Sequence, residues 1–224
     1  MNWLHILITM INKDLMIEYR TKTLYISVLS FASLMVVLLG FSLNGTSAMP
    51  VSWESGTLWL IVFISCVISF SRQDDKERWS DAHAGNLIAP VDRSLVFYSR
   101  VATSLVFVAA VEIIIIPLFF LMLHAFVPSH LFPFIGVMLL GTMGYVALGT
   151  FLASVVFASN LREILLPVML FPLSIPLFLA VILLTSGTIV GDMQGDLLWW
   201  GVLGAYVVIF LVLPGLLFDL LVEV

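Results

Sequence analysis

The residues best suited to chemistry are the charged ones, and much of the positive charge lies in one stretch. The chain of 224 residues is 62% hydrophobic and has nine Lys and Arg, five of them between Arg72 and Arg100. This stretch, RQDDKERWSDAHAGNLIAPVDRSLVFYSR, carries both signs of charge. Mixed charge suits contact with another protein, whereas a purely basic run favours anionic lipid. Residues 72–100 therefore indicate a docking surface, or a solvated loop that only fixes topology.

The sequence lacks the spacings of the common catalytic and metal sites. A phosphate-binding loop needs Gly-Lys followed by Ser or Thr, but none of the lysines at 13, 22 and 76 follows a glycine. His, Cys and carboxylates nowhere have metal-ligand spacing. The single Cys66 can form no internal disulfide. We expect no catalytic residue, no metal and no directly bound cofactor, so that any work needs a gradient or a partner.

The composition indicates an integral membrane protein. Charged residues make up 10% of the chain, against roughly 25% in soluble domains. A helix needs about 20 apolar residues to cross the hydrocarbon. We predict an all-α membrane protein whose six spans are residues 24–43, 57–71, 101–123, 132–158, 164–185 and 197–218. The second run is short, so this span either begins upstream near Trp53 or lies in a thinned region.

The first 23 residues predict a separate helix. Apolar residues share one helical face, and polar residues share another, as in a helix that lies in the membrane interface. An ordinary frayed amphipathic terminus is the alternative. We expect residues 1–23 to form a cytoplasmic interfacial helix and residues 24–224 to form one permease domain.

The distribution of Lys and Arg predicts the orientation. All nine lie in the N-terminal segment, in 72–100 and in 159–163, whereas the other connections and the tail have none. Because positive residues are retained on the cytoplasmic side, both termini and the loop 72–100 should be cytoplasmic.

Glu112 is the one ionisable residue inside the predicted spans. An ionised carboxylate there costs several kcal/mol unless it is paired or hydrated. Nearby Pro117 frees a backbone carbonyl near residue 113 and can kink the helix. Glu112 therefore has two possible roles. It is a polar residue on a transport pathway or at a subunit contact, or it is a protonated carboxyl with a purely structural role.

The stretch ERWSDAHAGNLIAPVDRSLVFYSRVATSLVF resembles the cytoplasmic loop and third span of the haem exporter protein B family. The residues that fit its pattern are Glu77, Arg78, Gly85, Ala89, Pro90, Val91, Asp92 and Arg93. Two positions depart from it: Trp79 replaces an acid, and Tyr98-Ser99-Arg100 stands where Gly-Lys is usual.

The resemblance continues through the third, fourth and fifth spans and covers about residues 10–185. The matching positions are Glu112 and Pro117, then Gly141, Gly144 and Gly149, then Pro167, Pro172 and Pro176. The glycines allow another helix to approach closely. The three prolines leave backbone carbonyls without helical partners. The span either acts as a gate or has a shape that only serves its packing against other helices.

The resemblance implies a permease subunit of an ABC transporter complex in the bacterial inner membrane, acting in haem delivery for c-type cytochromes. It implies that a separate cytoplasmic ATPase uses the ATP, that haem is a possible cargo, and that this chain is not itself an enzyme. The implied docking residues are Glu77, Arg78, Gly85, Pro90, Asp92 and Arg93. Further implied partners are haem-handling membrane subunits, a periplasmic haem chaperone and a second copy of the chain, with no nucleic acid.

Two alternatives remain open on sequence grounds. The six spans and the interfacial helix also resemble half of an ABC-2-type exporter, whose cargo would be a lipid, a glycan or a drug. A scaffold that transmits ATPase motion to other subunits, without transporting anything, would need the same docking loop.

The charge distribution predicts labelling from opposite sides of the membrane. A cysteine placed at Ser129 or Gly191 should react with an impermeant thiol reagent from the periplasm, because its loop lacks Lys and Arg. A cysteine at Ser80 should react only from the cytoplasm. Cytoplasmic labelling of residues 124–131 would reject the six-span arrangement.

Overall fold

The computed structural model describes residues 3–21, 23–43, 50–79, 93–156, 159, 161–192 and 196–220. Within these ranges the chain is helical apart from short connections. The helices are α1 (Trp3–Thr21), α2 (Thr23–Leu43), α3 (Val51–Trp79), α5 (Arg93–Leu123), α6 (Leu131–Val156), α7 (Arg162–Val190) and α8 (Asp196–Leu220).

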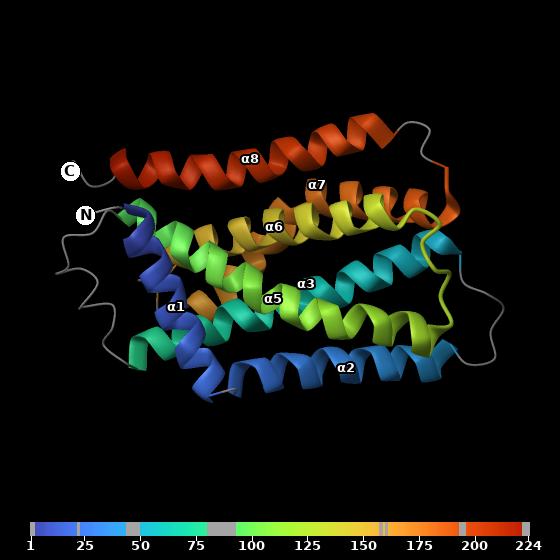
Figure 1. Ribbon diagram of the computed structural model, residues 1–224, viewed down its shortest axis with the longest axis horizontal. Helices are drawn as coiled ribbons and strands as arrows, with labels where there is room; N and C mark the ends of the chain where they lie inside the picture. The colour runs from blue at the N-terminus through green and yellow to red at the C-terminus, as the bar shows by residue number, and fades with distance from the viewer. Residues whose placement is uncertain are drawn as a thin grey trace.

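The helices form an elongated bundle with one oblique member (Figure 1). Helices α2, α3, α5, α6, α7 and α8 run along the long axis, and each is long and apolar enough to cross a membrane. Helix α1 runs across the bundle at the end where both chain termini lie. The predicted all-α, six-span class is therefore confirmed. An interfacial position for α1 stays a prediction, although its oblique direction fits one.

Two helices extend well beyond their apolar runs. Helix α3 begins at Val51, where the carbonyl of Pro50 accepts the first helical bond from the Glu54 N–H at 3.2 Å. The same helix continues to Trp79, and its 29 residues reach roughly 43 Å, which exceeds the hydrocarbon thickness. The short second span therefore begins upstream.

The predicted docking loop 72–100 is shorter in the structure than in the sequence-based prediction. Residues 72–79 continue α3 and residues 93–100 open α5, which leaves 80–92 outside the described residues. The physical reason is that Arg, Gln, Lys and Glu are good helix formers. The charged residues that follow the apolar run therefore end the membrane span but not the helix. Both helix ends lie at the same end of the bundle as the termini (Figure 1).

Helix α7 also runs past its predicted end at residue 185. It stops at Val190 because Gly191 adopts the left-handed conformation (φ 84°) and donates its N–H to the Gly187 carbonyl. Another residue at 191 would be strained, so Ser129 is the better of the two outer positions for cysteine labelling.

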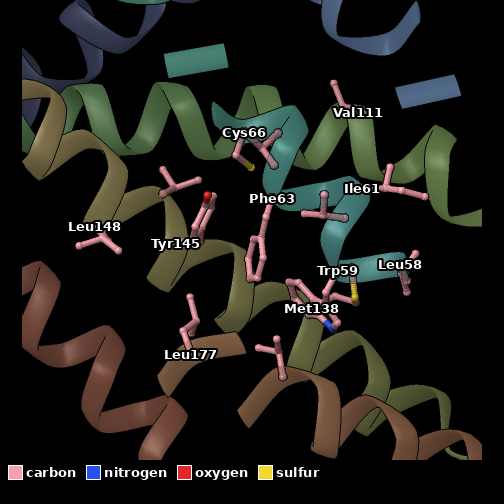
Figure 2. Close-up of a cluster of buried hydrophobic side chains, with 14 of the residues drawn as sticks. Leu58, Trp59, Ile61, Phe63, Cys66, Val111, Met138, Tyr145, Leu148 and Leu177 are labelled. Carbon is pink, nitrogen blue, oxygen red and sulfur yellow. The ribbon is translucent and has the colours of Figure 1, made fainter. Parts of the chain in front are cut away.

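The core is centred on α6, which has the largest buried share of the six spans. Its Tyr145 packs on Phe63 of α3, with ring centroids 4.1 Å apart (Figure 2). Phe63 in turn packs on Phe178 of α7, with ring centroids 3.8 Å apart. Lipid tails are as apolar as these side chains, so close packing and hydrogen bonds, not water exclusion, hold the helices together.

The three glycines of α6 lie where neighbouring helices come closest. A side chain at Gly141 would overlap the ring of Trp59, and one at Gly149 would overlap the ring of Phe70. A first side-chain carbon at Gly144 would lie 3.2–3.3 Å from side chains of α7 and α8, which is tighter than ordinary contact. Each glycine therefore makes room for a large group from another helix.

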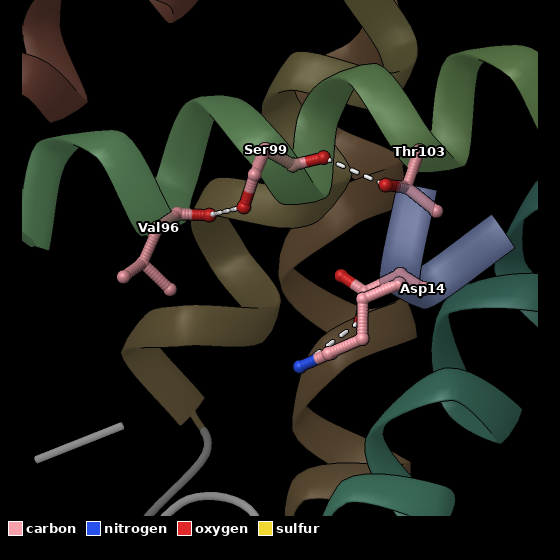
Figure 3. Close-up of polar contacts among 5 residues, drawn as sticks. Asp14, Val96, Ser99 and Thr103 are labelled. Atoms are coloured by element: carbon pink, nitrogen blue, oxygen red, sulfur yellow. Dashed lines mark hydrogen bonds and ion pairs between the residues drawn. The ribbon is translucent and has the colours of Figure 1, made fainter. Parts of the chain in front are cut away.

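Helix α1 rests on the first turns of α5 (Figure 3). Asp14 of α1 lies beside the part of α5 that carries Ser99 and Thr103, both of which bond backbone carbonyls of their own helix. Lys13 and Asp14 form an ion pair at 3.4 Å. Helix α1 is therefore packed against the start of α5.

The packing at Gly141 predicts a stability difference between two alanine substitutions. Gly141→Ala should lower the free energy of unfolding by about 1–3 kcal/mol, because the added carbon overlaps Trp59 and Val181. Gly201→Ala on α8 is the control, since nothing lies within 4 Å of its added carbon, and alanine favours helix by about 1 kcal/mol. Thermal unfolding in detergent measures both. Equal melting of Gly141→Ala and the native chain would contradict the packing.

Candidate functional site

A buried carboxyl joins α5 to α6 in the interior of the bundle. Glu112 of α5 is 7% exposed and Thr142 of α6 is 1% exposed. The Thr142 hydroxyl donates a 2.5 Å hydrogen bond to Oε1 of Glu112. The partner of Glu112 within the described residues is therefore a neutral hydroxyl from the neighbouring span, which reduces the cost of burying the carboxyl without supplying a countercharge.

Further polar groups surround this pair. Cys66 of α3 is fully buried and lies within electrostatic reach of Glu112 and Tyr145. The Tyr145 hydroxyl points toward the side of the cluster where α3 and α5 lie (Figure 2). In the described part of the chain, the buried hydroxyls of Ser69, Tyr145 and Thr150 have no hydrogen-bond partner. Glu112, Thr142, Cys66 and Tyr145 thus bring polar groups of α3, α5 and α6 together in the interior.

This polar region lacks the composition of a metal site. Among the described residues, no group of three or more His, Cys, Asp and Glu could hold a metal ion. What the arrangement offers chemically is a hydrogen-bonded carboxyl at a contact between two spans. A movement of α5 against α6 would have to break or re-form its bond to Thr142.

The predicted docking residues are only partly described. Glu77 and Arg78 lie in the last turn of α3, and Arg93 is the first residue of α5. Gly85, Pro90 and Asp92 lie outside the described residues. The structure thus places three of these positions on two helix ends at one end of the bundle (Figure 1), and their role in docking stays a prediction.

The predicted kink residues all lie inside continuous helices. Pro117 is in α5, and Pro167, Pro172 and Pro176 are in α7. The sequence analysis missed a further one, Pro214 in α8. Pro214 could have been predicted as a kink residue, because it lies inside an apolar run of more than 20 residues.

Glu54, at the opposite end of the bundle, is a further buried carboxyl that was not predicted from the sequence. Glu54 is 6% exposed, and its Oε2 accepts a 3.3 Å hydrogen bond from the Phe126 N–H. The Ser129 hydroxyl bonds the Ile189 carbonyl at 2.9 Å. The connection between α5 and α6 is therefore hydrogen-bonded to the start of α3 and to the end of α7. An acid in the first turn of a helix, where the dipole favours negative charge, was the signal in the sequence.

Six apolar spans around a buried polar contact define a multi-pass helical membrane protein. The family described as CcmB protein matches residues 5–219, which is nearly the whole chain. The chain belongs to this family, and the resemblance drawn from about residues 10–185 is confirmed. Membership implies membrane transport and cytochrome c biogenesis. No curated protein and no solved structure matches the chain.

The bond between Glu112 and Thr142 predicts unequal effects of two threonine substitutions on α6. Thr142→Val should lower the free energy of unfolding by about 1–3 kcal/mol, because it leaves the buried carboxyl without its donor. Thr150→Val is the matched control, since the buried Thr150 hydroxyl has no partner to lose. Equal effects of the two, measured by thermal unfolding in detergent, would show that the bond contributes nothing.

Substitutions of Glu112 separate its structural role from a role of its charge. Glu112→Gln keeps the acceptor oxygen and should assemble normally, whereas Glu112→Leu leaves Thr142 unpartnered and should impair assembly. Cytochrome c maturation in cells is the second readout. Normal maturation with Gln indicates a structural carboxyl, and its loss at normal chain levels indicates that the charge is used. Normal assembly and maturation with Leu would exclude both roles.

Proposed function

We propose that this chain is the membrane permease subunit of an ABC transporter complex that acts in haem delivery for c-type cytochromes. The observation that carries the proposal is the CcmB protein family match across residues 5–219 of a six-span helical bundle. The sequence has no phosphate-binding loop, so a separate cytoplasmic ATPase supplies the energy. Haem is the cargo, and ATP is bound by the partner.

The distribution of charge supports a bacterial inner-membrane location with both termini in the cytoplasm. The described helices that carry Lys and Arg place them toward the end of the bundle where the termini lie (Figure 1). The loop 124–130 at the other end has none. This asymmetry is the one that positive residues produce in membrane proteins.

The helical extensions of α3 and α5 support docking at the cytoplasmic end. Glu77, Arg78 and Arg93 lie where these helices reach past their apolar parts. A rigid helix end transmits a push from a partner better than a loose loop does, and α1 packs on the same part of α5. We propose that the ATPase binds here, through the helix ends and residues 80–92, including Gly85, Pro90 and Asp92.

The further partners follow from the family role. A second copy of the chain would pair with a second ATPase, and haem-handling membrane subunits with a periplasmic haem chaperone would receive the cargo. The ABC-2-type exporter architecture implied by the spans fits this arrangement. A different cargo, or a scaffold that moves nothing, is an outcome that the transport measurement below distinguishes.

The docking proposal predicts that reversing two charges releases the ATPase. The double variant Glu77→Lys with Arg78→Glu should insert normally but weaken ATPase binding at least tenfold, about 1.4 kcal/mol, because opposed charges replace matched ones at the interface. Copurification in mild detergent and ATP turnover measure the effect.

The control is Lys13→Glu with Asp14→Lys, which reverses a surface ion pair near the same end of the bundle. This control should leave ATPase binding unchanged. If the Glu77 and Arg78 variant copurifies and turns over ATP like the native chain, docking does not involve these residues.

A further inference from the structure

Two tyrosine hydroxyls bond backbone carbonyls on neighbouring helices, and both carbonyls lie at the same position relative to a proline. Tyr98 of α5 donates to the Leu211 carbonyl of α8 at 3.1 Å. Tyr206 of α8 donates to the Leu173 carbonyl of α7, also at 3.1 Å. Leu211 lies three residues before Pro214, and Leu173 lies three residues before Pro176.

The recurrence has a physical reason. Proline has no N–H, and its ring pushes against the carbonyl four residues earlier, which opens the helix at that turn. In hydrocarbon, a carbonyl in an opened turn must find its partner inside the protein. The carbonyls that lose a helical donor are those of Phe210 and Pro172, and the tyrosines bond the next carbonyls along, those of Leu211 and Leu173, in the same turns. Each tyrosine hydroxyl therefore ties a proline-containing turn to the adjacent helix.

The surrounding packing is built for both contacts. Gly215 follows Pro214, and a side chain at 215 would place its first carbon 2.6 Å from the Tyr98 hydroxyl oxygen. The Tyr206 ring packs on Phe210 with centroids 4.6 Å apart, and Gly144 of α6 leaves room for it. The glycine at 215 is thus required by the approach of Tyr98.

The two bonds connect three helices in series. Tyr98 lies five residues after Arg93, where α5 begins, so the first bond ties the start of α5 to α8. Leu211 and Tyr206 are five residues apart on α8, about 7.5 Å along the axis. The second bond then reaches α7, the helix with three prolines. Among the described residues, α5 and α7 make no direct contact.

We propose that Tyr98 and Tyr206 are positioning residues of a hydrogen-bonded relay from the start of α5, through α8, to the Pro176 turn of α7. Displacement of the α5 start moves the turn at Pro214, and α8 passes the movement through Tyr206 to the turn at Pro176. The relay depends on the proposed function in one respect, which is that the ATPase docking beside α5 starts the movement. The connection itself lies wholly within this chain.

Hydrogen–deuterium exchange of the full-length chain in lipid nanodiscs tests the relay. Tyr206→Phe should speed exchange of residues 168–180 of α7 roughly three- to tenfold, as expected for the loss of one hydrogen bond. Tyr98→Phe should speed exchange in the same segment, although α5 does not touch α7.

The matched control is Tyr145→Phe, which removes a buried tyrosine hydroxyl that has no partner. The Tyr145 ring lies near Phe178 of α7, with centroids 6.4 Å apart, so this variant controls for packing at α7. Exchange of residues 168–180 should not change.

Two further variants assign the effect to the Pro214 turn. Gly215→Ala should reproduce Tyr98→Phe, because the added carbon displaces the hydroxyl. In a Pro214→Ala background, where the turn regains its N–H, Tyr98→Phe should have no further effect on α7. If Tyr98→Phe leaves exchange of 168–180 at the native rate, or acts equally in the Pro214→Ala background, the relay is wrong.

A functional readout separates this inference from the proposed function. Tyr98→Phe with Tyr206→Phe should bind the ATPase normally and yet reduce cytochrome c maturation severalfold. Normal maturation would overturn the coupling role of the relay while leaving the proposed function intact. If the native chain binds no ATPase, the proposed function fails, and the exchange data still decide whether the relay exists.

Discussion

The arrangement of this bundle depends on hydrogen bonds between its spans, because backbone polar groups within the hydrocarbon have no water to bind. The Trp59 N–H meets the Thr185 hydroxyl at 2.8 Å, which ties α3 to α7. The Thr142 hydroxyl meets Glu112, which ties α6 to α5. Two tyrosine hydroxyls meet backbone carbonyls that tie α5 to α8 and α8 to α7. Four bonds thus link five of the six spans.

Close packing determines which helices these bonds can join. Helix α6 is the most buried span, and its glycines admit Trp59 and Phe70 of α3. The same glycine that accepts Trp59 also contacts Val181 of α7, so the ring reaches Thr185 on that helix. Packing and hydrogen bonding therefore support the same helix arrangement. In each of the proline-containing helices α7 and α8, one carbonyl beside a proline accepts a donor from a neighbouring helix.

The sequence was sufficient to predict the membrane class, the number of spans and the family, because all three depend on local composition and motif order. The helix extensions at 72–79 and 93–100 were missed, since charge was taken to end the helix as well as the span. The partners of Trp59, Tyr98 and Tyr206 were not predictable from one sequence, because each bond joins residues 33 to 126 positions apart. Tyr98 stood out only as a departure from the family pattern, and its bond to α8 now gives that departure a structural role.

We propose that this bundle moves haem in response to ATP hydrolysis by a docked partner. Vesicles reconstituted with the complete complex, with the ATPase facing outward, test it most directly. Added ATP should transfer haem to the vesicle interior, and vesicles lacking this chain should transfer none. Sustained ATP hydrolysis by the complex with no transfer of haem would contradict the permease role and identify the chain as a scaffold.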